Sequence, residues 1–363
     1  MLIRRVYKKN IIFWSRIFSN LLYPYFKIIN YFRPVYDLHS IAINTILVTE
    51  YHRIGDVLII EPVLKSIKKQ YPNAHLILIC NENIEKLAIH LKLADEIIPI
   101  TVPWTNWSWS IIDWCRVRSF AKQLSSKQID LAFDFKGDFR NGWFLWLIGP
   151  KVSFGYETTG GDYFFTNPIK MNQDLHQLHR ASEMVSKVGC ALVERHREEN
   201  VFNVDGAIVV HIGATDPRRS WPIKNWIELV NLLSKQFKTV IVETNESKEL
   251  IEQLKKTNEK VEYFKGDLVE FTAWLRQQRC LVCPDSMAGH LAAYVQIHVV
   301  SLFGSQIPEL TSPITNLGVV VSPEKACDHK RKPWRLCRKC MESILPLKVY
   351  RSIYNLIAEE IDK

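Results

Sequence analysis

The sequence of 363 residues lacks both of the glycine-rich loops that most often hold nucleotide phosphates. Neither half contains a G-x-G-x-x-G turn, so a dinucleotide-dependent dehydrogenase loses its main support, and the P-loop signature is missing too. Low-complexity tracts and short-period repeats are also missing. A composition of 47% hydrophobic and 23% charged residues is typical of globular proteins and excludes a disordered chain or a polytopic membrane protein.

A disulfide framework is not evident either. Most of the eight cysteines stand singly in strand-like or helix-like surroundings, for example Cys80, Cys115 and Cys190. Unpaired thiols of this kind are typical of a reducing compartment, so we expect a cytoplasmic protein.

Acidic residues are scarce in the first 42 residues, where seven Lys and Arg face the single Asp37. Over the whole chain, 47 Lys+Arg against 38 Asp+Glu give a net charge of +9. This balance favours anionic partners such as phosphorylated sugars, nucleotides or acidic lipid. Nucleic acid is not expected as a partner, because no nucleic-acid-binding module is recognisable.

Residues 1–42 are predicted to form a basic, aromatic helical extension. One helical face carries Ile11, Trp14, Phe18, Leu21, Leu22 and Tyr25. Arg16 and Lys27 bracket an uncharged stretch shorter than the ~20 residues that a spanning helix needs, and a cleavable signal is not expected. Two alternatives remain, a helix packed on the protein itself or one lying on a membrane surface. Pro24 is expected to end or kink the helix.

From residue 43 onward, apolar strands alternate with amphipathic helices in two consecutive runs, which predicts two α/β domains with parallel sheets. The domains are expected at 43–200 and 201–363, with ligands at the carboxyl ends of strands in a cleft between facing sheets. Strands are predicted at 44–50, 74–80, 95–100, 130–137, 206–214, 238–244, 280–284 and 298–304, and helices at 57–70, 111–124, 223–237, 247–257 and 288–296.

Two polar segments follow strands in the first half. In "YHRIGDVLIIEPVL", Asp56 lies at or next to the start of a helix, where it is either a helix cap or a catalytic carboxylate. In "DFKGDFRNGW", Lys136 and Arg140 belong to a charged turn. Arg140 either clamps a phosphate or carboxylate or is a solvated turn residue.

Two further segments follow strands in the second half. The loop of "HIGATDPRRSWPIKNW" carries Arg219 and Lys224 before a helix, which suits a diphosphate or an ordinary charged loop. In "CPDSMAGHLAAY", Asp285 and Ser286 lie at a strand-to-helix turn, followed by Gly289 and His290. This turn suits phosphate, although a histidine on an apolar helix is more often a core residue.

Taken in order, these segments resemble glycosyltransferase family 9, the family of lipopolysaccharide heptosyltransferases. The stretch from "RIGDVL" to "LILIC" resembles the opening of that family. "DFKGDFRNGWFLWLIGPKVSFGY" resembles its D-x-Q-G-x-x-R…GY segment, with Lys136 in place of glutamine. "RRSWP" is similar to its K-x-W-P element, with Arg219 at the lysine position. "PDSMAGHLAAY" is similar to D-T-G-x-x-H-x-x-A, with Ser286 for threonine and Met287 for glycine.

The resemblance implies a GT-B fold, in which the N-terminal Rossmann-like domain binds the acceptor and the C-terminal one binds the nucleotide sugar. It implies an inverting, metal-independent transfer without a cofactor, most simply of heptose from ADP-heptose, to a lipid A/Kdo-type inner-core acceptor of lipopolysaccharide. The enzyme would then work in the cytoplasm or peripherally on the inner face of the cytoplasmic membrane.

The resemblance also implies roles for single residues. Asp56 matches the catalytic base, and Lys136 and Arg140 lie at acceptor-side positions. The donor and its diphosphate would be bound by Arg219, Lys224, Glu246, Asp285, Ser286, Gly289 and His290.

A last segment, "CDHKRKPWRLCRKCMESI", allows two interpretations. Its side chains are either a structural zinc site or ordinary thiols, and the second is the default; the residues concerned are Cys327, His329, Cys337 and Cys340.

Two other hypotheses compete with the heptosyltransferase. One is an enzyme of the same fold with a nucleotide-hexose donor, since the motifs indicate a diphosphate more specifically than they indicate the sugar. The other is a protein that binds anionic glycolipid through its basic surface without catalysis.

Overall fold

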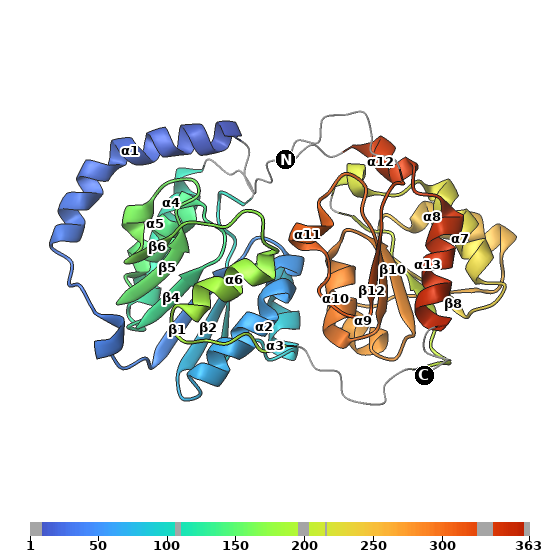
Figure 1. Cartoon of the computed structure of the whole chain (residues 1–363), viewed down its shortest axis with the longest axis horizontal. Coiled ribbons are helices and arrows are strands. Elements are labelled where there is room, and N and C mark those ends of the chain that lie inside the picture. The colour runs from blue at the N-terminus through green and yellow to red at the C-terminus, as the bar shows by residue number, and fades with distance from the viewer. Residues whose placement is uncertain (1–8, 106–109, 195–202, 215, 325–336, 359–363) are drawn as a thin grey trace. The chain divides into compact units, whose positions relative to one another are not determined.

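The computed structural model describes residues 9–105, 110–194, 203–214, 216–324 and 337–358. The chain divides into two compact units, residues 4–194 and residues 195–363, and each contains one parallel sheet (Figure 1).

The sheet of the N-terminal unit has the strand order β3-β2-β1-β4-β5-β6, and all its pairs are parallel. The chain leaves β1 toward one edge and returns at β4 toward the other, so the switch point lies between β1 and β4. The strands are β1 Thr45–Glu50, β2 His75–Cys80, β3 Glu96–Pro99, β4 Leu131–Asp134, β5 Val152–Tyr156 and β6 Asn167–Ile169. The helices are α2 Ile54–Gln70, α3 Glu85–His90, α4 Ile111–Ser125, α5 Phe139–Ile148 and α6 Gln177–Ser186, with 3-10 turns η1 Leu38–Ser40, η2 Glu82–Ile84 and η3 Asp162–Phe164.

Both faces of this sheet are covered, which explains why its central strands read as continuous apolar runs. Leu47 and Ala132 pack with α4 and α5 in one core cluster. Ile46 and Val48 point to the opposite face and are completely buried as well. Polar side chains are therefore left to the strand ends, where the site residues lie.

The C-terminal unit repeats the same winding, with the strand order β12-β11-β10-β7-β8-β9 and all pairs parallel. Its switch point lies between β7 and β10, and Trp226 is completely buried in its core. The strands are β7 Ile208–Val210, β8 Thr239–Val242, β9 Val261–Phe264, β10 Cys280–Pro284, β11 His298–Leu302 and β12 Gly318–Val321. The helices are α7 Ile223–Leu233, α8 Lys248–Thr257, α9 Leu268–Leu275, α10 Met287–Val295, α11 Pro308–Thr311, α12 Arg338–Glu342 and α13 Pro346–Ala358, with the 3-10 turn η4 Pro217–Arg219.

A long helix, α1 (Lys9–Tyr31), precedes the first sheet and docks on η3 and α5 of the same unit. Phe26 packs against the rings of Trp146, Tyr163 and Phe164, with ring centroids 4.9, 5.5 and 4.8 Å away. Asn30 donates to the Tyr163 carbonyl at 2.6 Å and accepts from the Trp146 indole N–H at 2.8 Å. These contacts fix which face of the helix is turned inward.

Pro24 was expected to end or kink α1; the helix continues through it to Tyr31, so it does not end there. A proline removes one backbone hydrogen bond, and the docking of Phe26 and Asn30 beyond it holds the last two turns in place. No helix among the described residues is long and apolar enough to cross a membrane.

Candidate active site

The first group of candidate residues lies at the carboxyl ends of β1 and β4, on both sides of the switch point. Helix α2 begins at Ile54, so Asp56 belongs to its first turn, and the N-cap residue Arg53 makes no side-chain capping bond. Lys136 follows β4 by two residues. This part of the sheet edge is where open parallel sheets bind ligands.

One lysine connects two carboxylates there. Lys136 Nζ lies 2.8 Å from Asp56 Oδ2 and 3.3 Å from Glu50 Oε2. The Glu50 side chain has no exposed surface, and Asp56 keeps 18% of its side chain exposed. Asp56 is therefore the carboxylate of the pair that a ligand can reach.

The ion pair decides the protonation of Asp56. Burial alone would raise the pKa of this carboxyl, but the Lys136 ammonium, with His52 and Arg53 nearby, outweighs burial and lowers the pKa to about 2. Burial likewise tends to lower the pKa of Lys136, and the carboxylates of Asp56 and Glu50 raise it above its ordinary value. Asp56 is thus ionised at neutral pH and is a weak base in this state.

A tight turn after β4 positions Lys136. The Asp134 carboxylate accepts hydrogen bonds from the Gly137 N–H at 3.1 Å and from the Asn141 amide at 2.9 Å. Gly137 has a φ of +73°, and a Cβ there would lie 2.8 Å from the Tyr156 Cβ, so only glycine fits. Burial raises the pKa of Asp134 to about 6 despite these hydrogen bonds.

Arg140, predicted on the acceptor side, lies one turn further along. Asp138 caps helix α5 through the Arg140 N–H, and its two oxygens also hold the guanidinium at 2.9 and 2.6 Å. The side chain is partly exposed, and this pairing fixes its direction.

The second group lies in the C-terminal unit, at the end of β10. Arg219 of η4 forms an ion pair of 3.0 Å with Asp285, two residues that stand far apart in the sequence. Arg219 Nε is buried and has no hydrogen-bond partner among the described residues. Ser286 is the N-cap residue of α10 without a side-chain capping bond, and His290 is buried one turn in. The structure thus brings together Arg219 and the turn that opens α10.

Gly289 has a packing role. A Cβ at this position would lie 3.0 Å from Pro313 Cγ, 3.2 Å from Cys283 Sγ and 3.2 Å from Ser301 Oγ. The close approach of α10 to β10 and β11 therefore accounts for this glycine, whether or not it also faces a phosphate.

A small cavity of about 210 Å³ lies in the C-terminal unit between the end of β7, η4 and the start of α7. Its walls are mostly apolar, and Glu246 and Arg338 supply its charged groups; the lining residues are Ile212, Pro217, Ser220, Trp221, Pro222, Ile223, Glu246 and Arg338. An apolar cavity with few charged groups suits a planar heterocycle attached to a polar sugar.

Glu246 has a neighbour that the sequence reasoning missed. A Cβ on Gly213 would lie 3.0 Å from the His211 ring and 3.5 Å from Glu246 Oε2, so these three residues lie together. Burial lowers the pKa of His211 to about 4 although Glu246 opposes the shift, so the imidazole is neutral. Its position directly after β7, at the switch point, was the signal available in the sequence.

One expected residue stands apart from these groups. Lys224 is exposed in the first turn of α7 and has no ion pair among the described residues. In the N-terminal unit, Glu50 was missed although it ends β1, and Asp134 although it ends β4; both are completely enclosed carboxylates at the switch point.

The cysteine-rich segment falls partly outside the described residues, since Cys327 and His329 are not among them. Cys337 is the N-cap residue of α12 and Cys340 lies buried within that helix. Within the described ranges, no three His, Cys, Asp or Glu side chains are arranged to hold a metal ion.

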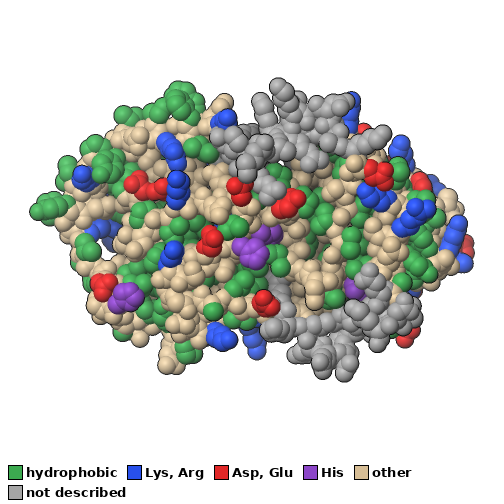
Figure 2. All heavy atoms as spheres, viewed as in Figure 1, with side chains coloured by type: hydrophobic (Ala, Val, Ile, Leu, Met, Phe, Trp, Pro, Cys, Tyr) green, Lys and Arg blue, Asp and Glu red, His purple; other side chains and the backbone are tan. Residues whose placement is uncertain are grey.

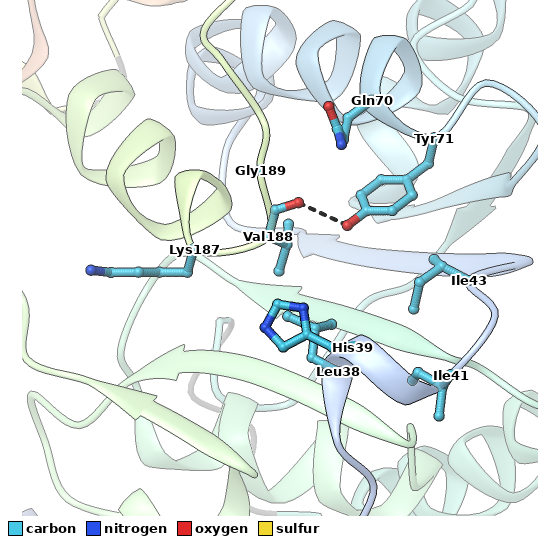
Figure 3. A pocket seen from close by; sticks show the side chains of 9 residues that line it. All are labelled: Leu38, His39, Ile41, Ile43, Gln70, Tyr71, Lys187, Val188 and Gly189. Carbon is cyan, nitrogen blue, oxygen red and sulfur yellow. Dashed lines mark hydrogen bonds between the residues drawn. The ribbon is translucent and has the colours of Figure 1, made fainter.

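A larger cavity of about 420 Å³ lies in the N-terminal unit but away from the carboxyl ends of the strands (Figure 3). It is formed by η1, the end of α2 and the segment after α6, where the Tyr71 hydroxyl donates to the Val188 carbonyl at 2.8 Å. None of the predicted site residues lines it.

Comparison with known proteins agrees with these observations. A sequence model of glycosyltransferase family 9 (heptosyltransferase) matches residues 117–339, more than half of the chain. The chain therefore belongs to this family and is a glycosyltransferase. Curated protein sequences gave no match.

Solved structures of the family share the fold. A family 9 glycosyl transferase from Veillonella parvula has a TM-score of 0.70 at 16% identity, covering 87% of this chain and 97% of that one. The ADP-heptose LPS heptosyltransferase II of E. coli has 0.69 at 15%, covering 87% and 99%. The E. coli heptosyltransferase WaaC with ADP has 0.70 at 17%, covering 86% and 99%. The GT-B class predicted from the sequence is confirmed.

Proposed function

We propose that the protein is an inverting, metal-independent heptosyltransferase that moves heptose from ADP-heptose to an inner-core acceptor of lipopolysaccharide. The single observation that carries this proposal is the placement of the family's motif residues at the two switch points, with Asp56 beside Lys136 and Arg219 beside Asp285. Similar structures are named as an ADP-heptose heptosyltransferase and as WaaC with ADP, which supports the donor.

On the acceptor side, Asp56 would take the proton of the attacking hydroxyl. The acceptor oxygen forms a bond with the anomeric carbon while the bond from that carbon to the diphosphate breaks, and ADP leaves with the electron pair. Because a carboxyl with a pKa of about 2 is a weak base, proton transfer would come late and departure of ADP would carry much of the barrier. We assign Lys136 and Arg140 to binding of the anionic acceptor.

On the donor side, Arg219 would meet the charge that grows on the diphosphate, together with the N–H groups that open α10 around Ser286. Asp285 holds the Arg219 guanidinium in place. Glu246, at the rim of the small cavity, would accept hydrogen bonds from the ribose. Lys224 and His290 remain proposed members of this donor site, and we assign Gly289, which the sequence placed in the same site, to packing of α10 beside it.

The acceptor would be a lipid A/Kdo-type glycolipid, which places the enzyme in the cytoplasm and peripherally at the inner face of the cytoplasmic membrane. This proposal is supported by the net charge of +9 and the basic N-terminus. Positive charge for the leaving group would come from Arg219, so the proposed reaction requires neither a metal nor a cofactor.

The experiment begins with thermal unfolding of the full chain in the presence of ADP, UDP, GDP, ADP-heptose and nucleotide hexoses, since a ligand that binds the folded form raises Tm. We expect ADP and ADP-heptose to stabilise selectively, and radiolabelled heptose to be transferred to a heptose-free acceptor. Selective stabilisation by a nucleotide hexose would identify the alternative donor. Glycolipid binding without turnover, and without any nucleotide effect, would identify a non-catalytic binding protein.

A further inference from the structure

Helix α1 docks through a face that mixes polar and apolar side chains, and it leaves a second, apolar side exposed, unlike an ordinary surface helix, whose single apolar stripe faces the core. Its only two fully buried described side chains are Ser19 and Phe26. Ser19 accepts from the Gly161 N–H at 2.8 Å, and its carbonyl accepts from the Tyr163 hydroxyl at 3.0 Å. Arg33, just beyond the helix, stacks on the Trp146 ring at 3.8 Å.

The opposite side of α1 is apolar and exposed. Trp14 is 66% exposed, Leu21 73% and Tyr25 62%. Steps of three, four and seven residues place them on one stripe with Ile17 and Ile28, which are exposed as well. Figure 2 shows hydrophobic side chains gathered at the upper left of the molecule, where Figure 1 places α1. Three of the six residues that the sequence predicted on the apolar face, Trp14, Leu21 and Tyr25, belong to this exposed stripe.

The charged side chains of α1 all have one sign. Lys9, Arg16 and Lys27 are exposed on one flank of the stripe, about a quarter to a third of a turn away, and α1 contains no Asp or Glu. An apolar stripe that contains a tryptophan and a tyrosine, with lysine and arginine beside it, is complementary to the surface of an anionic bilayer. A protein partner usually carries charges of both signs, so binding to such a partner would not explain why all the charged residues of α1 are basic.

We propose that the outer face of α1 lies in the plane of an anionic lipid bilayer, so that the stripe from Trp14 to Ile28 enters the headgroup region. The helix is held to η3 and α5 by the contacts of Ser19, Phe26 and Asn30, so membrane binding fixes the orientation of the N-terminal unit toward the bilayer. The proposal does not depend on the transferred sugar or on catalysis.

The test is flotation of the purified full chain with vesicles of phosphatidylglycerol and phosphatidylcholine, compared with vesicles of phosphatidylcholine alone. We expect binding to the anionic vesicles, and a loss of roughly tenfold or more in partitioning for the double variant Leu21→Ser/Tyr25→Ser. The matched control is Ile89→Ser/Ile112→Ser, which removes two apolar side chains that are also more than half exposed elsewhere in the same unit. All three proteins are expected to keep the same Tm, because these side chains are exposed.

A second variant tests the charge. Arg16→Glu/Lys27→Glu is expected to lose binding to anionic vesicles at low salt, and added salt is expected to weaken binding of the unchanged protein. Vesicle binding that survives in both double variants would overturn the proposal. A second outcome would also overturn the proposal. If no form of the protein binds vesicles, and sedimentation analysis shows a dimer that dissociates in Leu21→Ser/Tyr25→Ser, the stripe is an interface between two copies of the chain.

Discussion

Lys136 Nζ lies 2.8 Å from Asp56 Oδ2, so the proposed catalytic base of this glycosyltransferase is already in an ion pair before any acceptor arrives. The lysine stands where the resembling motif has glutamine, which carries no charge. A cation at this position keeps the base ionised and also limits its strength, and the same cation touches the buried carboxylate of Glu50.

Replacing Lys136 by methionine should move the acidic limb of the pH–rate profile to higher pH. Without the ammonium, burial is left to raise the pKa of Asp56, so the base is protonated, and activity lost, at a pH where the unchanged enzyme still works. The variant also leaves two carboxylates without their cation and should lose about 3 kcal/mol of stability. Lys136→Arg keeps the charge and serves as the control; an unshifted limb in the methionine variant would contradict the assignment.

The stability of the protein between pH 4 and pH 6.5 should contain two opposing contributions. The pKa of Asp134, raised by burial to about 6, means that the folded state holds a proton that the unfolded state releases above about pH 4. Stability from this group is therefore present at low pH and falls as pH rises toward 6. In Asp134→Asn this decrease, on the order of 2 kcal/mol between pH 4.5 and 6.5, should disappear from urea unfolding of the N-terminal unit measured at those two pH values.

His211 should act in the other direction. Burial lowers the pKa of His211 to about 4. Between about pH 6.5 and pH 4, the unfolded state therefore binds a proton at this histidine and the folded state does not. Stability of the C-terminal unit should therefore fall as pH decreases through this window. His211→Gln should remove that dependence; a variant with the same pH profile as the unchanged protein would show that the imidazole is not kept neutral.

Arg219 and Arg218 offer a comparison between adjacent residues of the same type. Arg219 is paired with buried Asp285 and is 19% exposed, whereas Arg218 is paired with Asp216 and is 57% exposed. Arg219→Met should weaken ADP binding by roughly tenfold or more in calorimetry, because a charge-assisted contact to phosphate is lost. Arg218→Met should change it little. Equal losses in both variants would indicate a general effect of positive charge.

A substitution at Gly289 distinguishes a role in packing from a role in phosphate binding. Gly289→Ala places a methyl group within 3.2 Å of Cys283 and Ser301 in the interior, so Tm of the ligand-free protein should fall. ADP affinity measured well below the new Tm should stay within a few-fold of the original. A large loss of affinity with an unchanged Tm would mean that the glycine instead gives access to the diphosphate.

The sequence predicted the central strands of both sheets and the class of fold, because strands buried on both faces are unmistakable apolar runs. Short strands near the sheet edges, such as β6 (Asn167–Ile169) and β9 (Val261–Phe264), carry no such signal and were not predicted. In each unit, the edge of the sheet at which the candidate residues lie was also predictable, since the carboxyl ends of parallel strands share one edge; Asp56 lies there in the first unit and Asp285 in the second.

Which side chains meet at that edge was not predictable. The pairing of Asp56 with Lys136 depends on the twist of the sheet and on the turn that Gly137 allows, and neither can be predicted from the local sequence. Glu50 and Asp134 end apolar strands, and a single carboxylate there looks like an ordinary boundary. For α1, periodicity identified the helix and part of its exposed apolar stripe, but it could not say which side would be turned toward the protein.

The contact between α1 and the rest of the N-terminal unit affects any attempt to express a shortened chain. Phe26 covers Trp146, Tyr163 and Phe164, and Asn30 uses the indole N–H of that tryptophan. A chain that started after Arg33 would leave a cluster of three aromatic rings open to water, and that cluster would be prone to self-association during purification. The N-terminal helix therefore covers part of the hydrophobic surface of the domain. Aggregation of a truncated protein would thus say nothing about contact between the helix and lipid.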